Sequence, residues 1–236
     1  HLSIRRQRQM CIRDRNLASD VDARKKYQEY WERFVWWPQS PGYSRIERKY
    51  WRESEKYMDF LIKPHIGDSR IPCWEIMNEP WICPAMDEEV LFDFLSHMCT
   101  YGKSLGSNIT VGLGSWSEVP RVENLVDVVS FHDFTQNPEK MKESLRKAGE
   151  YKKKTGKPIL LTEWGSHIID EPRAITDEGQ LRFYENMMPI VLESRIGWYF
   201  WGLVTGREPF SFQSIFYPNG HKRPAASVIM QYVMQR

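Results

Sequence analysis

The sequence predicts a parallel α/β fold, because short apolar runs alternate along the chain with longer amphipathic stretches. The runs Ile71–Met77 and Ile109–Leu113 have the length and composition of buried strands. Between them, Asp87 precedes apolar residues at helical spacing that continue to about Leu105. Strands separated by helices in this way pair in parallel. The length of 236 residues suits one large domain, which we place over residues 16–236.

The remaining elements follow the same alternation. Strands are predicted at Ile71–Met77, Ile109–Leu113, Val128–His132, Ile159–Thr162 and Gly197–Trp201, and helices at Tyr50–Ile66, Asp87 to about Leu105, Asn137 to Gly156, Asp177 to about Glu193, and Ala225–Gln235. Asn137-Pro138 has the N-cap and N1 residue types, and Gly156 ends that helix before Pro158. Asp177, with Gln180 three residues later, is typical of a helix start.

The net charge of +2 arises in the first residues. Residues 1–15 contain five arginines and one aspartate, a net charge of +4, so the remainder carries −2. The domain therefore lacks the basic character of a nucleic-acid surface. We interpret residues 1–15 as a non-native basic tail, with a functional basic arm as the alternative. The sequence has no apolar run long enough to cross a membrane. We expect a monomer, and the sequence does not distinguish a secreted from a cytoplasmic protein.

The cysteines do not indicate a metal site. Cys11, Cys73, Cys83 and Cys99 form neither a CxxC pair nor a cluster with histidine. Structural zinc sites need such closely spaced ligands. We therefore expect neither a metal nor an organic cofactor.

Two predicted strands end in a glutamate. Glu79 follows the first strand within Trp74-Glu75-Ile76-Met77-Asn78-Glu79-Pro80, and Glu163 follows the fourth within Leu160-Leu161-Thr162-Glu163-Trp164-Gly165. In a parallel barrel the carboxyl ends of the strands form the active-site face. Glycoside hydrolysis needs two such carboxyl groups, one on each side of the bond that is cleaved. Ordinary surface glutamates after strands are the alternative. Glu75 lies inside its strand, and we expect a buried ion-pair partner rather than a catalytic group.

These motifs resemble those of the retaining glycoside hydrolases with (β/α)8 barrels, and most nearly glycoside hydrolase family 5, over roughly residues 45–236. Asn78-Glu79-Pro80 is similar to the acid/base motif at the end of strand four, and Glu163-Trp164-Gly165 to the nucleophile motif at the end of strand seven. Two strands lie between them, as the family order requires. Ser130-Phe131-His132-Asp133-Phe134 resembles the strand-six motif, and Gly197-Trp198-Tyr199-Phe200-Trp201 resembles strand eight.

The resemblance implies hydrolysis of a β-glucan or β-mannan type oligo- or polysaccharide with retention at the anomeric carbon. Glu79 would be the general acid/base, with a pKa raised by burial and by the other carboxylate, and Glu163 the nucleophile. Asn78 would bond the sugar 2-hydroxyl, His132 would face the site or support it, and Trp201 would be a sugar platform or pack in the core. Trp81, Trp116 and Trp164 follow strand ends and could line subsites or have structural roles.

One position departs from the family pattern. Phe134 stands where the family has a tyrosine that often bonds the nucleophile, so the surroundings of Glu163 would lack one donor. This favours, weakly, a carbohydrate-binding barrel without activity. The presence of both glutamates opposes that alternative.

The resemblance also places the first predicted strand at position four of eight. Residues 16–50 contain no clear apolar strand and resemble the long loop after strand three. We therefore expect only strands four to eight of an incomplete barrel. Its exposed sheet edges would make the polypeptide poorly soluble and weakly active or inactive, a non-functional fragment of such an enzyme.

Overall fold

The computed structural model describes residues 46–82, 87–166, 176–204 and 214–234. The predicted basic tail, the predicted loop after strand three up to residue 45, Cys11 and Cys83 lie outside the described residues. The chain divides into two compact units, His1–Val129 (unit 1) and Ser130–Arg236 (unit 2). Our assignment of residues 16–236 to a single domain stays a prediction.

Unit 1 contains two parallel strands, β1 (Trp74–Asn78) and β2 (Ile109–Leu113). All five residues of β2 are buried, as a strand covered on both faces requires. The strand β2 has the predicted bounds, whereas β1 begins three residues later than predicted. Pro72 has no N–H to donate, and the first backbone bond to the neighbouring segment is from Trp74 N to Asn108 O.

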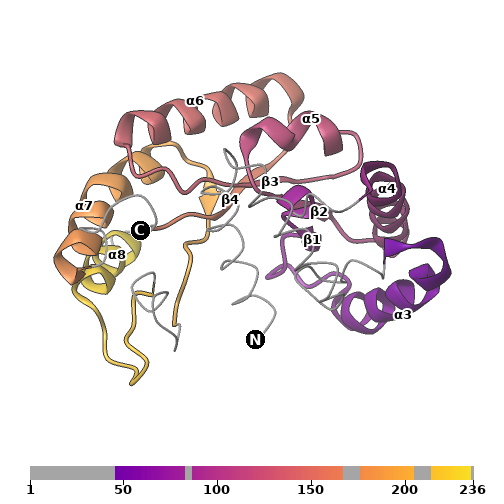
Figure 1. Cartoon of the computed structure of the whole chain (residues 1–236), viewed down its shortest axis with the longest axis horizontal. Helices are drawn as coiled ribbons and strands as arrows, with labels where there is room; N and C mark the ends of the chain where they lie inside the picture. Colours follow the sequence, from indigo (N-terminus) through magenta and orange to yellow (C-terminus); the bar gives the residue numbers. More distant parts are fainter. Residues whose placement is uncertain (1–45, 83–86, 167–175, 205–213, 235–236) are drawn as a thin grey trace, which may run out of the picture. The chain divides into compact units, whose positions relative to one another are not determined.

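Two long helices cover this pair of strands. The helix α3 (Trp51–Ile62) is preceded by η2 (Arg48–Tyr50) and followed by η3 (Lys63–His65), and α4 (Glu88–Ser104) packs against α3, β1 and β2 (Figure 1). The predicted cap of α4 is confirmed, because the Asp87 side chain accepts hydrogen bonds from the N–H groups of Glu89 and Val90. Apolar residues of α4 and β2 form the core, including Leu91, Phe94, Leu95, Met98, Ile109, Val111 and Leu113.

Three short elements of unit 1 have no counterpart in the sequence prediction. They are η4 (Pro80–Ile82) after β1, η5 (Trp116–Glu118) after β2, and α5 (Val119–Val122). The turn η4 follows the carboxyl end of β1, η5 follows that of β2, and α5 comes directly after η5. Single helical turns are too short to produce an apolar periodicity, which explains why the pattern did not reveal them.

Unit 2 contains the strands β4 (Ile159–Glu163) and β5 (Gly197–Trp198) and all of β3 (Val129–His132) except its first residue. The strand order is β3, β4, β5, and β4 pairs in parallel with β5. The last strand is shorter than predicted. Beyond Trp198 the segment still runs along β4, because Tyr199 N donates to Leu161 O and Trp201 N to Trp164 O.

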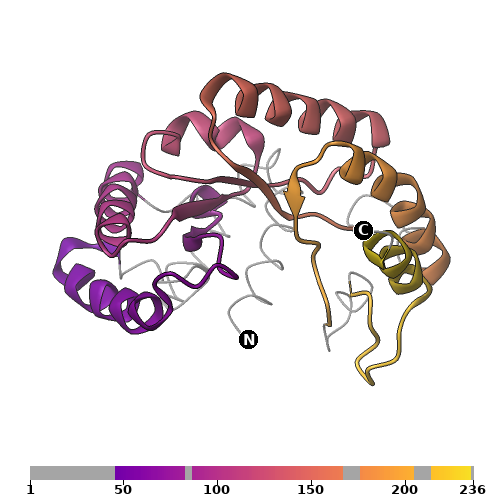
Figure 2. The ribbon, with the colours of Figure 1, turned by 180° about the vertical axis from the view of Figure 1, so that it is seen from behind.

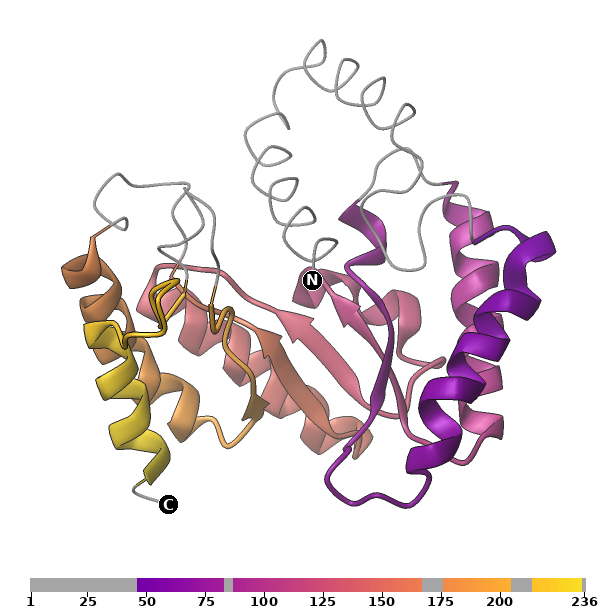
Figure 3. The same ribbon diagram turned by 90° about the horizontal axis from the view of Figure 1, so that it is seen from below.

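Unit 2 also contains three helices: α6 (Pro138–Thr155), α7 (Asp177–Glu193) and α8 (Pro224–Met234). The helix α7 packs against both others, and Figures 2 and 3 show α7 and α8 side by side in orange and yellow. The predicted ends of α6 are confirmed. The Asn137 side chain caps its first N–H groups, and Gly156 closes it in the left-handed conformation at φ 74°.

The predicted start of α7 at Asp177 is confirmed. Thr176 is its N-cap, and the Thr176 side chain accepts a hydrogen bond from Gly179 N. The Gln180 side chain donates to the carbonyl of Ser214. Within the described residues, no helix has the length and apolarity needed to cross a membrane.

Candidate active site

Glu79 is placed by an irregular end of β1. The register of β1 against β2 shifts between Glu75 and Asn78, and Glu79 follows with a positive φ of 46°. Its backbone N–H donates to the carbonyl of Gly112 at 2.6 Å, which holds the turn against β2. The residue is 7% exposed, so its carboxyl group is largely shielded from water. A non-glycine residue at positive φ is uncommon and often marks a functional position.

Glu75 differs from its predicted role. It is exposed rather than buried. A methyl group at Gly112 would lie 2.7 Å from the Glu75 carboxyl carbon, so this side chain lies over the bare backbone of a glycine. Alternation along β1 alone could not reveal this position over a glycine of the next strand.

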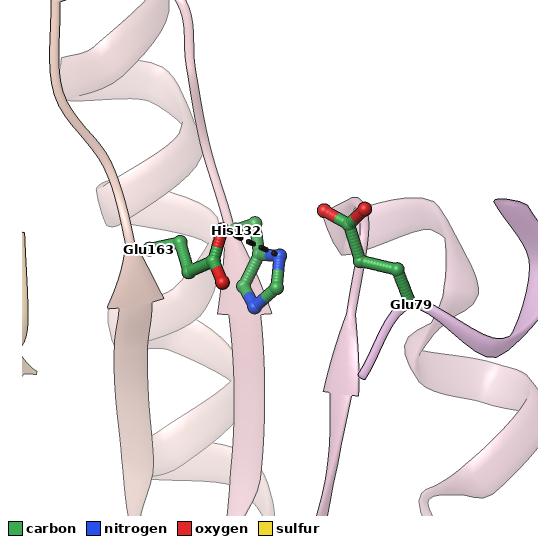
Figure 4. A group of neighbouring side chains, drawn as sticks. All are labelled: Glu79, His132 and Glu163. Atoms are coloured by element: carbon green, nitrogen blue, oxygen red, sulfur yellow. Dashed lines mark ion pairs between the residues drawn. The ribbon is translucent and has the colours of Figure 1, made fainter. Parts of the chain in front are cut away.

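Glu163 and His132 lie together at the ends of β4 and β3 in unit 2. Figure 4 shows the Glu163 carboxylate beside the imidazole, and His132 Nδ1 lies 3.7 Å from Glu163 Oε2. The His132 side chain is fully buried, whereas that of Glu163 is 13% exposed. The two strand ends are joined by a backbone hydrogen bond from Asp133 N to Glu163 O. This geometry lets a buried imidazole orient a carboxylate that still reaches solvent.

Packing explains why a tryptophan and a glycine, Trp164 and Gly165, follow Glu163. Trp164 is 0% exposed, and its ring makes edge contacts with Tyr184 and Trp198 at centroid distances of 5.5 and 5.8 Å. A methyl group at Gly165 would lie 2.3 Å from the carbonyl oxygen of Trp201. The burial of Trp164 supports its structural alternative over a subsite role, and Gly165 is required by the close approach of the chain after β5.

The other three tryptophans predicted to bind substrate are half-buried and follow strands. Trp81 lies in η4, where the guanidinium of Arg121 is 5.0 Å from its ring centroid. Trp116 begins η5 after β2, and Trp201 follows β5. Asn78 ends β1, also half-buried and directly before Glu79. Their substrate-binding roles stay predictions.

Sequence reasoning did not single out Glu118. This half-buried residue ends η5, and its Oε2 accepts a hydrogen bond of 2.9 Å from Gly114 N. Burial raises the pKa of its carboxyl group above the usual value, and the charge of Glu79 raises it further, against the hydrogen bond from Gly114. Its position five residues after β2 was the only signal in the sequence.

Comparison with known proteins identifies the fold. No protein-family model and no curated protein matches the sequence. Among solved structures, a β-D-glucuronidase from Dictyoglomus thermophilum matches at a TM-score of 0.61 with 16% identity, over 79% of this chain and 36% of that one. A GH113 β-1,4-mannanase matches at 0.54 with 15% identity, over 79% and 63%. An endo-β-1,4-mannanase from Thermotoga petrophila matches at 0.53 with 19% identity, over 81% and 51%.

These similarities show the fold, and the chain spans less than two thirds of each of these three proteins. The described strands and helices have the parallel α/β arrangement of the TIM-barrel class, which confirms the predicted fold class. Within that class, the carboxyl ends of the strands are where catalytic groups are found. Glu79 directly follows β1, and Glu163 ends β4.

Proposed function

We propose that this chain hydrolyses β-glycosidic bonds with retention, using Glu79 as general acid/base and Glu163 as nucleophile. One observation carries the proposal: two glutamates stand at the carboxyl ends of parallel strands in a fold shared with solved glycosidases. Burial of Glu79 supports its role as the acid, because a carboxyl group removed from water holds its proton more strongly. Partial exposure of the Glu163 side chain is compatible with access of a sugar to this group.

The proposed reaction has two steps. Glu163 attacks the anomeric carbon while Glu79 gives its proton to the departing glycosidic oxygen, which leaves a glycosyl-enzyme ester. Water then attacks the same carbon while Glu79 takes its proton, and Glu163 is released. In this scheme His132 orients Glu163, and Asn78 bonds the sugar 2-hydroxyl more strongly as the transition state forms.

The narrower assignment to glycoside hydrolase family 5 or a close relative rests on the sequence motifs. Asn78-Glu79-Pro80 and Glu163-Trp164-Gly165 are the residues that support it. We propose a β-glucan or β-mannan as substrate. The solved structures with this fold include mannanases and an endoglucanase, and also a β-glucuronidase. A panel of aryl β-glucosides, β-mannosides, β-cellobiosides and β-glucuronides would rank the sugars directly.

Covalent trapping tests the mechanism. A 2-deoxy-2-fluoro glycoside with a good leaving group should inactivate the protein and add one sugar mass to the peptide containing Glu163. Glu163→Ala should abolish both labelling and turnover. Labelling of a different peptide, or a product of inverted configuration by proton NMR, would rule out the proposed mechanism. Retaining enzymes hold their two carboxyl groups ~5–5.5 Å apart, so a ligand-bound structure gives a second test.

A second candidate function is sugar binding without turnover. Phe134 favours it, because a phenyl ring cannot donate the hydrogen bond to Glu163 that the family tyrosine provides. Saturable binding of a β-linked oligosaccharide together with no release from an activated aryl glycoside would support it. Restoration of turnover by Phe134→Tyr would identify the missing donor as the cause.

A further inference from the structure

The segment at the end of β4 keeps the hydrogen-bonding pattern of a strand beyond the strand's last residue. On one side, the carbonyl of Glu163 accepts a hydrogen bond from Asp133 N at 2.9 Å. On the other side, the carbonyl of Trp164 accepts from Trp201 N at 2.7 Å. Successive carbonyls of a strand point to opposite neighbours, so a donor for the next carbonyl, that of Gly165, is expected on the side of β3.

A side chain supplies this donor. The amide Nε2 of Gln136 donates to the carbonyl of Gly165 at 3.3 Å and to that of Phe134 at 2.9 Å. An amide nitrogen carries two N–H groups, so both bonds can form together. Gly165 is buried, and a buried carbonyl that loses a donor loses more free energy than the bond itself contributes. Gln136 therefore continues the pairing of β4 where the chain after β3 has left the sheet.

The loop that carries Gln136 is held at both of its ends. At its start, Asp133 Oδ1 accepts a hydrogen bond of 2.9 Å from Thr135 N. At its end, Asn137 is the N-cap of α6, and its side chain accepts from the first N–H groups of that helix. A side chain that extends from an anchored loop can fix a neighbouring segment, because the loop does not move with it.

We propose that Gln136 is a positioning residue that holds the end of β4 so that the Glu163 carboxylate is placed for attack on the anomeric carbon. The inference rests on the proposed function, in which Glu163 is the nucleophile. Gln136 does not touch the substrate in this scheme and acts through the backbone of Gly165, two residues after Glu163. A displacement of about 1 Å in a reacting group can lower a rate by about a hundredfold, so one bond to this segment matters for the rate.

The Gln136→Met variant tests the donor. It keeps the length of the side chain, but a thioether cannot donate a hydrogen bond. Gln231→Met is the matched control, because Gln231 is exposed on α8 in the same unit and the chemical change is identical. If Gln136→Met does not fold, Gln136→Glu takes its place, since an ionised carboxylate has the same shape as the amide and only accepts hydrogen bonds.

Inactivation by a 2-deoxy-2-fluoro glycoside isolates the attack by Glu163. In Gln136→Met the limiting rate constant of inactivation should fall about tenfold or more, while the concentration for half-maximal inactivation changes by less than about twofold. Gln231→Met should match the wild type in both quantities. A lower melting temperature with an unchanged limiting rate would show that Gln136 has a structural role only, and would overturn the inference.

Hydrogen exchange measured by NMR tests the bond to Gly165 without a substrate. The N–H groups of Asp133 and Trp201 bond the two preceding carbonyls, so loosening of this segment should speed their exchange. Both should exchange faster in folded Gln136→Met than in the control. If the wild type reacts with no glycoside, the proposed function has failed, and these exchange rates decide the inference by themselves. Unchanged exchange at both positions would overturn it whatever the activity.

Discussion

The backbone N–H of Trp201 donates a hydrogen bond of 2.7 Å to the carbonyl oxygen of Trp164, which ties the chain after β5 to the residue that follows Glu163. In return, the carbonyl of Trp201 lies so close to Gly165 that no side chain fits between them. The position of the proposed nucleophile therefore depends on the segment that carries the predicted sugar platform.

Gly165→Ala tests this packing. The added methyl group would lie 2.3 Å from the Trp201 carbonyl oxygen, so one of the two backbones must move. We expect a loss of about 1–3 kcal/mol in the free energy of unfolding, measured in urea, and a fall in activity. Gly149→Ala is the control. It lies in α6 with nothing within 4 Å of the added methyl, and should gain about 0.5–1 kcal/mol. Equal effects of the two changes would contradict the packing argument.

His132 is expected to affect the rate more than the substrate affinity. Its imidazole lies 3.7 Å from the Glu163 carboxylate and is fully buried, so it holds that group in place without reaching solvent. His132→Gln should lower kcat roughly tenfold or more, equivalent to at least ~1.4 kcal/mol in the barrier. Single-turnover kinetics with an aryl glycoside measure the glycosylation step directly. A change confined to KM would show that His132 contacts substrate instead.

The two described cysteines should react slowly with thiol reagents. Burial raises the pKa of Cys73 to about 11, with a smaller contribution from Glu75, and raises that of Cys99 to about 12. At pH 8 only about one Cys73 thiol in a thousand is then the reactive thiolate. Iodoacetamide labelling followed by peptide mapping should show Cys73 reacting faster as pH rises from 8 to 10 in the folded protein. Labelling at the rate of an unfolded control at pH 8 would be inconsistent with this burial.

Asp177 should stabilise unit 2 through two partners near α8. It accepts hydrogen bonds from the Tyr217 hydroxyl and from the guanidinium of Arg223, which is 5% exposed. Asp177→Asn would remove the negative charge that faces the buried Arg223 guanidinium, so we expect a loss of about 3 kcal/mol in unfolding free energy. Arg223→Met combined with Asp177→Asn should recover part of this loss. A double variant less stable than Asp177→Asn would contradict the charge-pair explanation.

The same cluster predicts a dependence on alkaline pH. The hydrogen bond to Asp177 raises the pKa of Tyr217 above its ordinary value of about 10. The protonated phenol is therefore favoured by the fold, and its contribution is complete below pH ~10 and is lost as the pH rises through the higher folded value. Melting temperatures at pH 9 and 11 should differ more in the wild type than in Tyr217→Phe.

Helix ends and buried strands could be predicted from sequence because their causes are local. Asn137 and Gly156 delimit α6 through caps that involve only neighbouring residues, and β2 is a continuous apolar run. Features with non-local causes could not be predicted. The Gln180 side chain donates to Ser214, which is distant along the chain, and the Glu75 side chain lies over Gly112 of the next strand and is exposed.

The candidate site divides in the same way. Glu79 and Glu163 could be found because each follows an apolar strand and lies within a recognisable motif. Glu118 could not, because its relation to Glu79 depends on a single 3-10 turn that returns the chain to Gly114. Burial of Trp164 likewise depends on Tyr184 and Trp198, which come from later elements.

Glu79 and Arg195 are the two non-glycine residues with positive φ in the described parts of the chain. Glycine adopts this conformation without the steric cost of about 1–2 kcal/mol that other residues carry. Replacing either residue by glycine should therefore yield a more heat-resistant protein. At Arg195, two residues after the end of α7, a screen for thermal stability alone would select glycine. At position 79 the same change would remove the proposed proton donor, so a screen for thermal tolerance and a screen for sugar release should select opposite residues there.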